Sequence, residues 1–192
     1  MSNYPNAAKG LKMMFWAEIA AIIAAVFAMI PFIGFVGSLA SIACAVISIV
    51  GIYTAGKDDA GFKKAFLFTI LSLVAAVVAA CVSFIPVVGT IISSIIEVAV
   101  TIFDLVVTYY VITTSANILR NIGAEDVAKK GMNVWKIVMI CAIAGMVLSI
   151  LSVIPLVNVI AALLIVIVAI VELIANILYL VFLFKGYKAL GA

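Results

Sequence analysis

Four acidic residues lie inside long apolar runs, and they are the side chains best suited to chemistry: Glu18, Glu97, Asp104 and Glu172. An acid near the middle of a membrane span costs on the order of 3 kcal/mol to insert, against a gain of about 0.5 kcal/mol for each Leu or Ile. Such acids usually face the interior of a helical bundle or a hydrated cavity. They are therefore the first candidates for a site that handles a cation or a proton.

Polar residues follow one another along the apolar run 90–114 at steps of three or four. They are Ser94, Glu97, Thr101, Asp104 and Thr108. This spacing places them on one face of a helix, opposite a face of Ile, Val and Phe. The two acids cancel much of the insertion energy of such a run. We therefore expect this span to need partner helices along its polar face.

A weaker polar face lies in the run 159–184, where Glu172, Asn176 and Tyr179 share one side of a helix, and the run 38–55 carries a milder stripe that includes Ser41 and Ser48. We expect spans two, four and six to face one another around a polar interior. The predicted substrate or ion pathway residues are Asp104, Glu172, Glu97, Asn176, Thr101, Thr108 and Ser94.

Two interpretations of this polar interior stay open. In the first, it is a pathway for a small cation, a proton or a small cationic solute, and the protein is a transporter or channel. In the second, the polar groups only join helices, because Ser, Thr, Asn and protonated carboxyl groups hydrogen-bond across membrane helices. The protein would then be a non-transporting scaffold, assembly factor or accessory subunit. Glu18 is expected nearer the lysine-rich interface, where we expect its side chain to snorkel to the interface or to pair with Lys12 instead of serving a function.

The chain lacks the residues that most enzymes and metal sites use. It has no His, and its three cysteines, Cys44, Cys81 and Cys141, are far apart within apolar runs. Such spacing favours neither a disulfide framework nor a metal site. The eleven Lys and Arg residues border apolar runs instead of gathering on one folded face with aromatic residues. We therefore expect no enzyme activity, no cofactor, no metal and no nucleic-acid partner.

Composition defines the elements that must position these side chains. Of the 192 residues, 69% are hydrophobic and 10% are charged, whereas soluble domains have about 45–50% and about 25%. Lipid must therefore solvate most of the chain, and a bilayer-spanning helix needs roughly 20 apolar residues. The predicted fold is an all-α polytopic membrane bundle, a single membrane domain over residues 1–192. Its six transmembrane helices are expected at residues 13–30, 38–55, 64–85, 90–114, 134–154 and 159–184.

The connections between these runs alternate in character. Three are short and uncharged, and each begins with the same dipeptide: Ile30-Pro31, Ile85-Pro86 and Ile154-Pro155. Proline and its preceding residue favour the end of one helix and the start of the next. The other two connections are polar, and Asp58 and Asp59 in the first can cap the start of span three. This alternation predicts three tandem hairpins, approximately residues 10–56, 61–122 and 131–188.

The basic residues indicate an orientation. All eleven Lys and Arg lie with the two termini and the polar linkers, and none lies in the three short turns. Positive charge stays on the cytoplasmic side of a membrane, so both termini are expected in the cytoplasm, with the protein integral to the cell membrane. Gly37, Ser41 and Ala45 recur at four-residue steps, which allows close helix packing within one chain or between copies. The lipid bilayer is therefore the expected partner, and a homo-oligomer or a membrane protein partner is an open alternative.

Overall fold

Six long helices make up the chain. The computed structural model describes residues 3–30, 34–85, 88–151 and 155–191, with the side chains at 88–91, 94, 149–151 and 155–162 left undescribed. The helices are α1 (Pro5–Ala28), α2 (Gly34–Ala55), α3 (Ala60–Val82), α4 (Val88–Asn121), α5 (Glu125–Leu151) and α6 (Pro155–Ala189). All six are long and apolar enough to cross a membrane, and no strand occurs in the described ranges. The predicted all-α fold of six membrane helices is thus confirmed.

The helix ends differ from the apolar runs, mainly on the lysine-rich side. Helix α1 begins at Pro5, α4 continues to Asn121 and α6 to Ala189, so the predicted bounds at these ends were too short. Hydropathy detects only the apolar stretch, whereas a helix continues through polar turns as long as its backbone groups stay paired. Several helices therefore extend beyond the apolar spans with their lysines.

The two aspartates of the first polar linker cap different helices. Asp59 caps α3 as predicted, since its Oδ1 accepts a hydrogen bond of 2.7 Å from the backbone N–H of Gly61. Asp58 caps α1 instead, which corrects the prediction that it caps span three. Its two carboxylate oxygens accept from the side-chain amide of Asn6 and from the backbone N–H of Ala7, each at 2.7 Å. A carboxylate satisfies the unpaired N–H groups of a helix start and favours its dipole.

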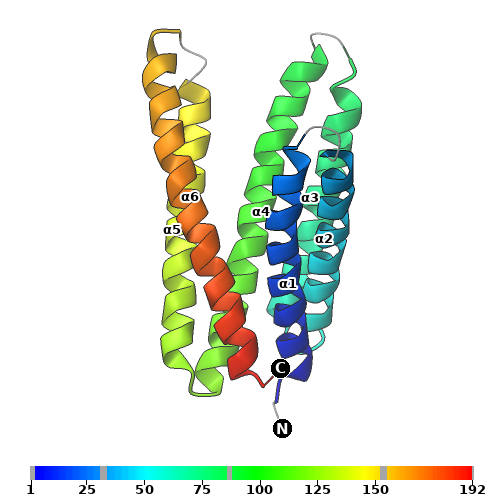
Figure 1. The fold of residues 1–192 in the computed structure, drawn as a ribbon, viewed down its shortest axis with the longest axis vertical. Coiled ribbons are helices and arrows are strands. Elements are labelled where there is room, and N and C mark those ends of the chain that lie inside the picture. Colours follow the sequence, from blue (N-terminus) through cyan, green and yellow to red (C-terminus); the bar gives the residue numbers. More distant parts are fainter. Residues whose placement is uncertain (1–2, 31–33, 86–87, 152–154, 192) are drawn as a thin grey trace.

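The helices divide into a four-helix body and a diverging pair. Figure 1 shows that α5 and α6 separate from α1–α4 toward the end of the molecule opposite the termini. We call the end with both termini and both polar linkers the linker end. Helix α1 packs on α2, α3 on α4 and α5 on α6, which is the pairing that hairpins would give. The turns at Pro31 and Pro86 lie outside the described residues, and the tandem repeat stays a prediction.

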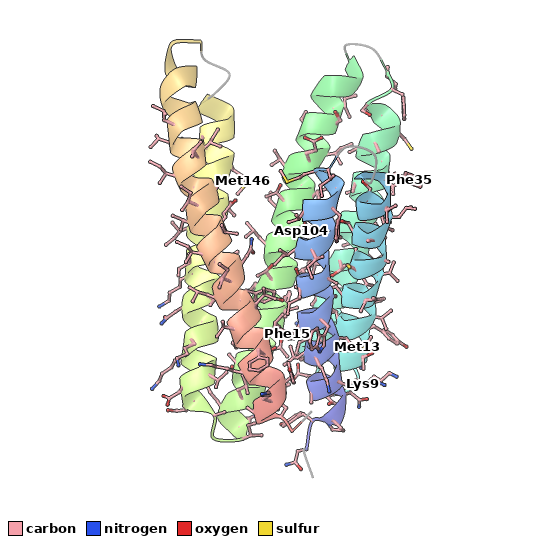
Figure 2. The ribbon with its side chains drawn as sticks, viewed as in Figure 1. Lys9, Met13, Phe15, Phe35, Asp104 and Met146 are labelled. Carbon is pink, nitrogen blue, oxygen red and sulfur yellow. The ribbon has the colours of Figure 1, made fainter. Side chains whose placement is uncertain are left out.

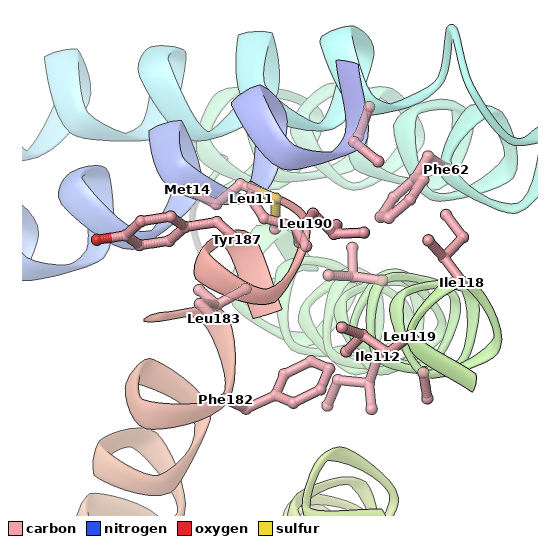
Figure 3. Packing of buried hydrophobic residues seen from close by; sticks show 14 of the residues in the cluster. Leu11, Met14, Phe62, Ile112, Ile118, Leu119, Phe182, Leu183, Tyr187 and Leu190 are labelled. Carbon is pink, nitrogen blue, oxygen red and sulfur yellow. The ribbon is translucent and has the colours of Figure 1, made fainter. Parts of the chain in front are cut away.

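A buried apolar cluster at the linker end joins all six helices, and we call it the linker-end core. Figure 3 shows Leu11 of α1, Phe62 of α3, Ile112 of α4 and Phe182 of α6 packed close together. Ile52 of α2 and Val134 of α5 complete the set of helices. The core closes the molecule on this side, whereas the diverging ends of α5 and α6 leave large apolar side chains such as Leu163 and Leu173 exposed to the surroundings.

Small residues allow α1 and α2 to approach closely. A Cβ atom added at Gly51 would lie 2.9 Å from the carbonyl oxygen of Gly10, and one added at Gly37 would lie 2.7 Å from the carbonyl oxygen of Ala24. Both distances are too short for a real side chain. The small-residue stripe that contains Gly37 therefore serves packing within one chain at this position.

Candidate functional site

Asp104 lies midway along α4 and is held by a neighbouring helix. Its Oδ1 accepts a hydrogen bond of 2.6 Å from the hydroxyl of Ser72 on α3, a residue with only 7% of its surface exposed. Figure 2 shows Asp104 well away from Lys9, which lies near the linker end. The acid that the sequence places near the middle of span four is thus far from the lysine-rich side.

Asp104, which is itself exposed, lies in an open depression of about 540 Å³ that α1, α2, α3 and α4 line; we call it the Asp104 cavity. Its walls are mostly Ile, Leu, Val and Ala. The polar side chains among its lining residues are Glu18, Ser48, Thr69, Ser72, Asp104 and Thr108. No Lys or Arg is among the residues that line it, so its carboxyl groups face hydroxyls and not basic partners.

A second cavity of about 230 Å³ adjoins the first toward α6, and we call it the Tyr179 cavity. The two share Glu18, Ser48 and Thr108, together with apolar neighbours. Asn176 and Tyr179 of α6 add an amide and a phenol to the second cavity. Residues of α1, α2, α4, α5 and α6 thus line the Tyr179 cavity, and α3 lines only the adjoining Asp104 cavity.

Apolar side chains close the Tyr179 cavity on the side of the linker end. Met14, Ile52 and Val111 line the cavity and belong to the linker-end core. One helical turn after Met14, on the side away from the linker end, α1 presents Glu18. The polar groups therefore lie directly beyond a buried apolar layer.

The cavities bring together only part of the predicted pathway. Asp104, Thr108 and Asn176 line them, whereas Glu97, Thr101 and Glu172 line neither; exposure does not separate the two sets, since Asp104 and Asn176 are exposed as well. The side chain of Ser94 lies outside the described residues. The Thr101 and Thr108 hydroxyls each donate to the carbonyl oxygen four residues back, at 2.9 Å. A pathway role for the predicted residues stays a prediction.

Spans two, four and six meet less directly than the sequence pattern predicts. Helices α4 and α6 touch sparsely in the part of the chain that the structure describes. Their polar groups are connected through α1, which supplies Glu18, and through α3, which supplies Thr69 and Ser72. The polar interior is therefore built from five helices around α1 and α4 instead of three facing helices.

Glu18 and Ser72 were not among the predicted pathway residues, although both line the Asp104 cavity. Glu18 forms no ion pair with Lys12 in the described structure, and the Lys12 ammonium group lies 6.0 Å from the centre of the Tyr187 ring. Of the two alternatives expected for Glu18, pairing with Lys12 was therefore wrong, and snorkelling to the interface stays a prediction. The three-residue spacing of Thr69 and Ser72 marks a polar face on span three that the stronger stripe of span four obscured.

The arrangement offers oxygen atoms to a positively charged species. Two carboxyl groups and several hydroxyls could coordinate a small cation or relay a proton, because both chemistries need oxygen ligands or titratable acids. Comparison of the chain with models of protein families, with curated proteins and with solved structures finds no match. The fold and the composition define the class: a six-helix, multi-pass membrane protein.

Proposed function

We propose that this protein is a small transporter or channel that passes a proton, a small cation or a small cationic solute across the membrane. The observation that carries the proposal is the Asp104 carboxyl group, which lines a cavity of about 540 Å³ with hydroxyls and without a basic side chain. An acid kept away from the interface of an apolar bundle is costly to insert and marks ion or proton pathways. The role is permeation and not catalysis.

The distribution of charge supports an orientation for this pathway. Lys57, Lys130 and Lys185 all belong to the linker end, where both termini also lie. By the positive-inside rule this end faces the cytoplasm of a cell membrane. The linker-end core then closes the pathway on the cytoplasmic side, and the cavities lie beyond it. Transport requires this core to separate, and the diverging α5–α6 pair is the part that we propose to move.

Flux through reconstituted protein tests the proposal. Purified protein in liposomes is subjected to a potential or a pH gradient, and proton or monovalent cation movement is followed with an internal dye. We expect Asp104→Asn to reduce flux at least tenfold, because it removes the ionisable carboxyl group while keeping an acceptor for Ser72. Glu97→Gln is the matched control, since Glu97, like Asp104, is an exposed acid on α4 but lines neither cavity. Equal flux through Asp104→Asn and the unchanged protein would overturn the proposal.

A second candidate function follows from the same carboxyl group. The hydrogen bond from Ser72 to Asp104 ties α3 to α4, which is what a scaffold, an assembly factor or an accessory subunit would need from an acid that only joins helices. In that case the unchanged protein carries no flux, and the loss of Ser72 affects stability alone.

A further inference from the structure

A groove between α5 and α6 at the linker end combines two lysines with an apolar wall. Its volume is about 230 Å³, and Lys130, Asn133 and Lys185 supply its polar side chains. Ile137, Leu178 and Val181 are among its apolar residues. We propose that this groove, the α5–α6 groove, binds one anionic phospholipid, with the phosphate at the lysines and an acyl chain along the apolar wall.

The spacing of the groove residues orders them along the membrane normal. Lys130, Asn133 and Ile137 follow one another on one face of α5, and Leu178, Val181 and Lys185 do so on α6. The two helices run in opposite directions, so both lysines lie at the linker end and both Ile137 and Leu178 lie deeper (Figure 1). Lys130 and Ile137 are seven residues apart, which is about 10 Å along a helix. This is the order of groups in a phospholipid: charge at the surface, then hydrocarbon.

The lysines of the groove are available for a ligand. Within the described residues the one ion pair joins Lys129 to Glu125 at 3.6 Å, so neither Lys130 nor Lys185 is neutralised in this way, and Asp126, one turn before Lys130, forms no ion pair with it. An anionic headgroup would supply the negative charge that Lys130 and Lys185 lack as a partner. Basic pockets between membrane helices on the cytoplasmic side bind such headgroups. A zwitterionic lipid would bring a choline cation against the same lysines.

The wall of the groove favours a lipid over a free anion. Leu178 and Val181 are 38% and 41% exposed, although they belong to a helix that packs well through buried Phe182. A free phosphate would leave this apolar surface uncovered, whereas an acyl chain covers it. The proposal therefore commits to a phospholipid, and it does not depend on the proposed transport function.

Native mass spectrometry of the detergent-solubilised protein tests the charge part of the proposal. Titration with dioleoylphosphatidylglycerol should show one molecule bound more tightly than any further ones, and dioleoylphosphatidylcholine should not bind in this way. Each lysine near an anionic lipid contributes about fivefold to affinity, so Lys130→Gln with Lys185→Gln should weaken the first binding step about thirtyfold. The matched control is Lys129→Gln with Lys188→Gln, which makes the same charge change on the same two helices outside the groove.

A second pair of variants tests the apolar wall while leaving the lysines in place. Val181→Trp fills the groove and should weaken phosphatidylglycerol binding at least tenfold, whereas Leu173→Trp, on α6 and exposed but not lining the groove, should leave it unchanged. Unaltered thermal unfolding without added lipid establishes that each variant is folded. The proposal would be overturned if the groove variants at Lys130 and Lys185 and the control variants at Lys129 and Lys188 lost binding equally, or if neither pair lost binding. Phosphatidylcholine binding as tightly as phosphatidylglycerol would also overturn it. Competition by glycerol 3-phosphate at similar concentrations, with Val181→Trp unaffected, would also overturn it in favour of a free-anion site.

Discussion

The Ser72 hydroxyl lies 2.6 Å from Oδ1 of Asp104 and joins α3 to α4 where both residues line the Asp104 cavity. This bond connects the two candidate functions, because one carboxyl group can hold a helix and also receive a cation. A substitution at Ser72 removes the bond and keeps the acid. A substitution of Asp104 by Asn removes the ionisable group and keeps an oxygen that can accept the bond. The pair therefore separates the two roles.

We expect Ser72→Ala to lower the free energy of unfolding by about 0.6 to 1.7 kcal/mol, the average and the maximum measured for hydrogen bonds between membrane helices. Unfolding in mixed micelles measures it. If Asp104 serves permeation, Ser72→Ala retains most of the flux that Asp104→Asn loses. The reverse result, with Asp104→Asn harmless and Ser72→Ala destabilising in a protein without flux, supports the scaffold alternative.

The sequence predicts Glu172 and not Glu18 as a pathway residue, whereas the cavities favour Glu18 over Glu172. Glu18 lines both cavities, whereas Glu172 is exposed and lines neither. We expect Glu18→Gln to reduce flux severalfold and Glu172→Gln to leave it nearly unchanged, because only Glu18 faces the proposed pathway. The liposome assay compares them directly. Loss of flux in Glu172→Gln alone would favour the three-span interior predicted from the sequence over the cavities.

Gly131 of α5 packs against the ring of Phe182, so Gly131→Ala should destabilise the protein by about 1–3 kcal/mol. An added Cβ would overlap the ring edge, and Phe182 is only 2% exposed and has little room to move. The comparison is Gly145→Ala on the same helix, where an added Cβ meets nothing within 4 Å. That change should be neutral or stabilise by up to about 1 kcal/mol through helix propensity. Thermal unfolding of both variants in detergent measures the difference, and similar values would contradict the packing described for α5 and α6.

Asp58 should contribute to stability more than an exposed linker residue does. Asp58→Ala removes two hydrogen bonds at the start of α1, to Asn6 and Ala7, and we expect a loss of about 1–2 kcal/mol. Asp58→Asn keeps one oxygen acceptor and should lose less. Denaturant or detergent unfolding ranks the three proteins, and a stability of Asp58→Ala equal to that of the unchanged protein would show that the cap is not formed in the membrane.

The sequence predicts the number and class of the helices because run length and hydropathy are local properties. It does not predict where α1 begins or where α6 ends, since the helical turns that contain Lys9 and Lys185 are polar. Nor does it place Asp58, whose partners Asn6 and Ala7 lie in a distant part of the chain. Such contacts depend on tertiary packing, which periodicity does not report.

The candidate site was predictable only in part for a related reason. Asp104 and Glu97 share one face of α4, yet only Asp104 lines a cavity. From Asp104 toward Glu97 the α5–α6 pair diverges from the four-helix body (Figure 1). The polar face of α4 therefore continues to Glu97, but α5 and α6 do not cover it there. Glu172 lies on the same diverging side of Asn176 along α6. Periodicity identifies a face of a helix, but the neighbour of that face is set by how the helices cross.

The contact between α1 and α6 has a consequence for biogenesis. Phe15 of α1 packs against Phe184 and Tyr187 of α6, with ring centres 5.4 and 5.6 Å apart. Helix α1 leaves the ribosome first of the six and α6 last, so the aromatic face of α1 has no partner during the insertion of every intervening helix. Until α6 arrives, that face must be shielded by lipid or by the insertion machinery. Chains truncated before Phe184 should therefore be recognised as unassembled and degraded.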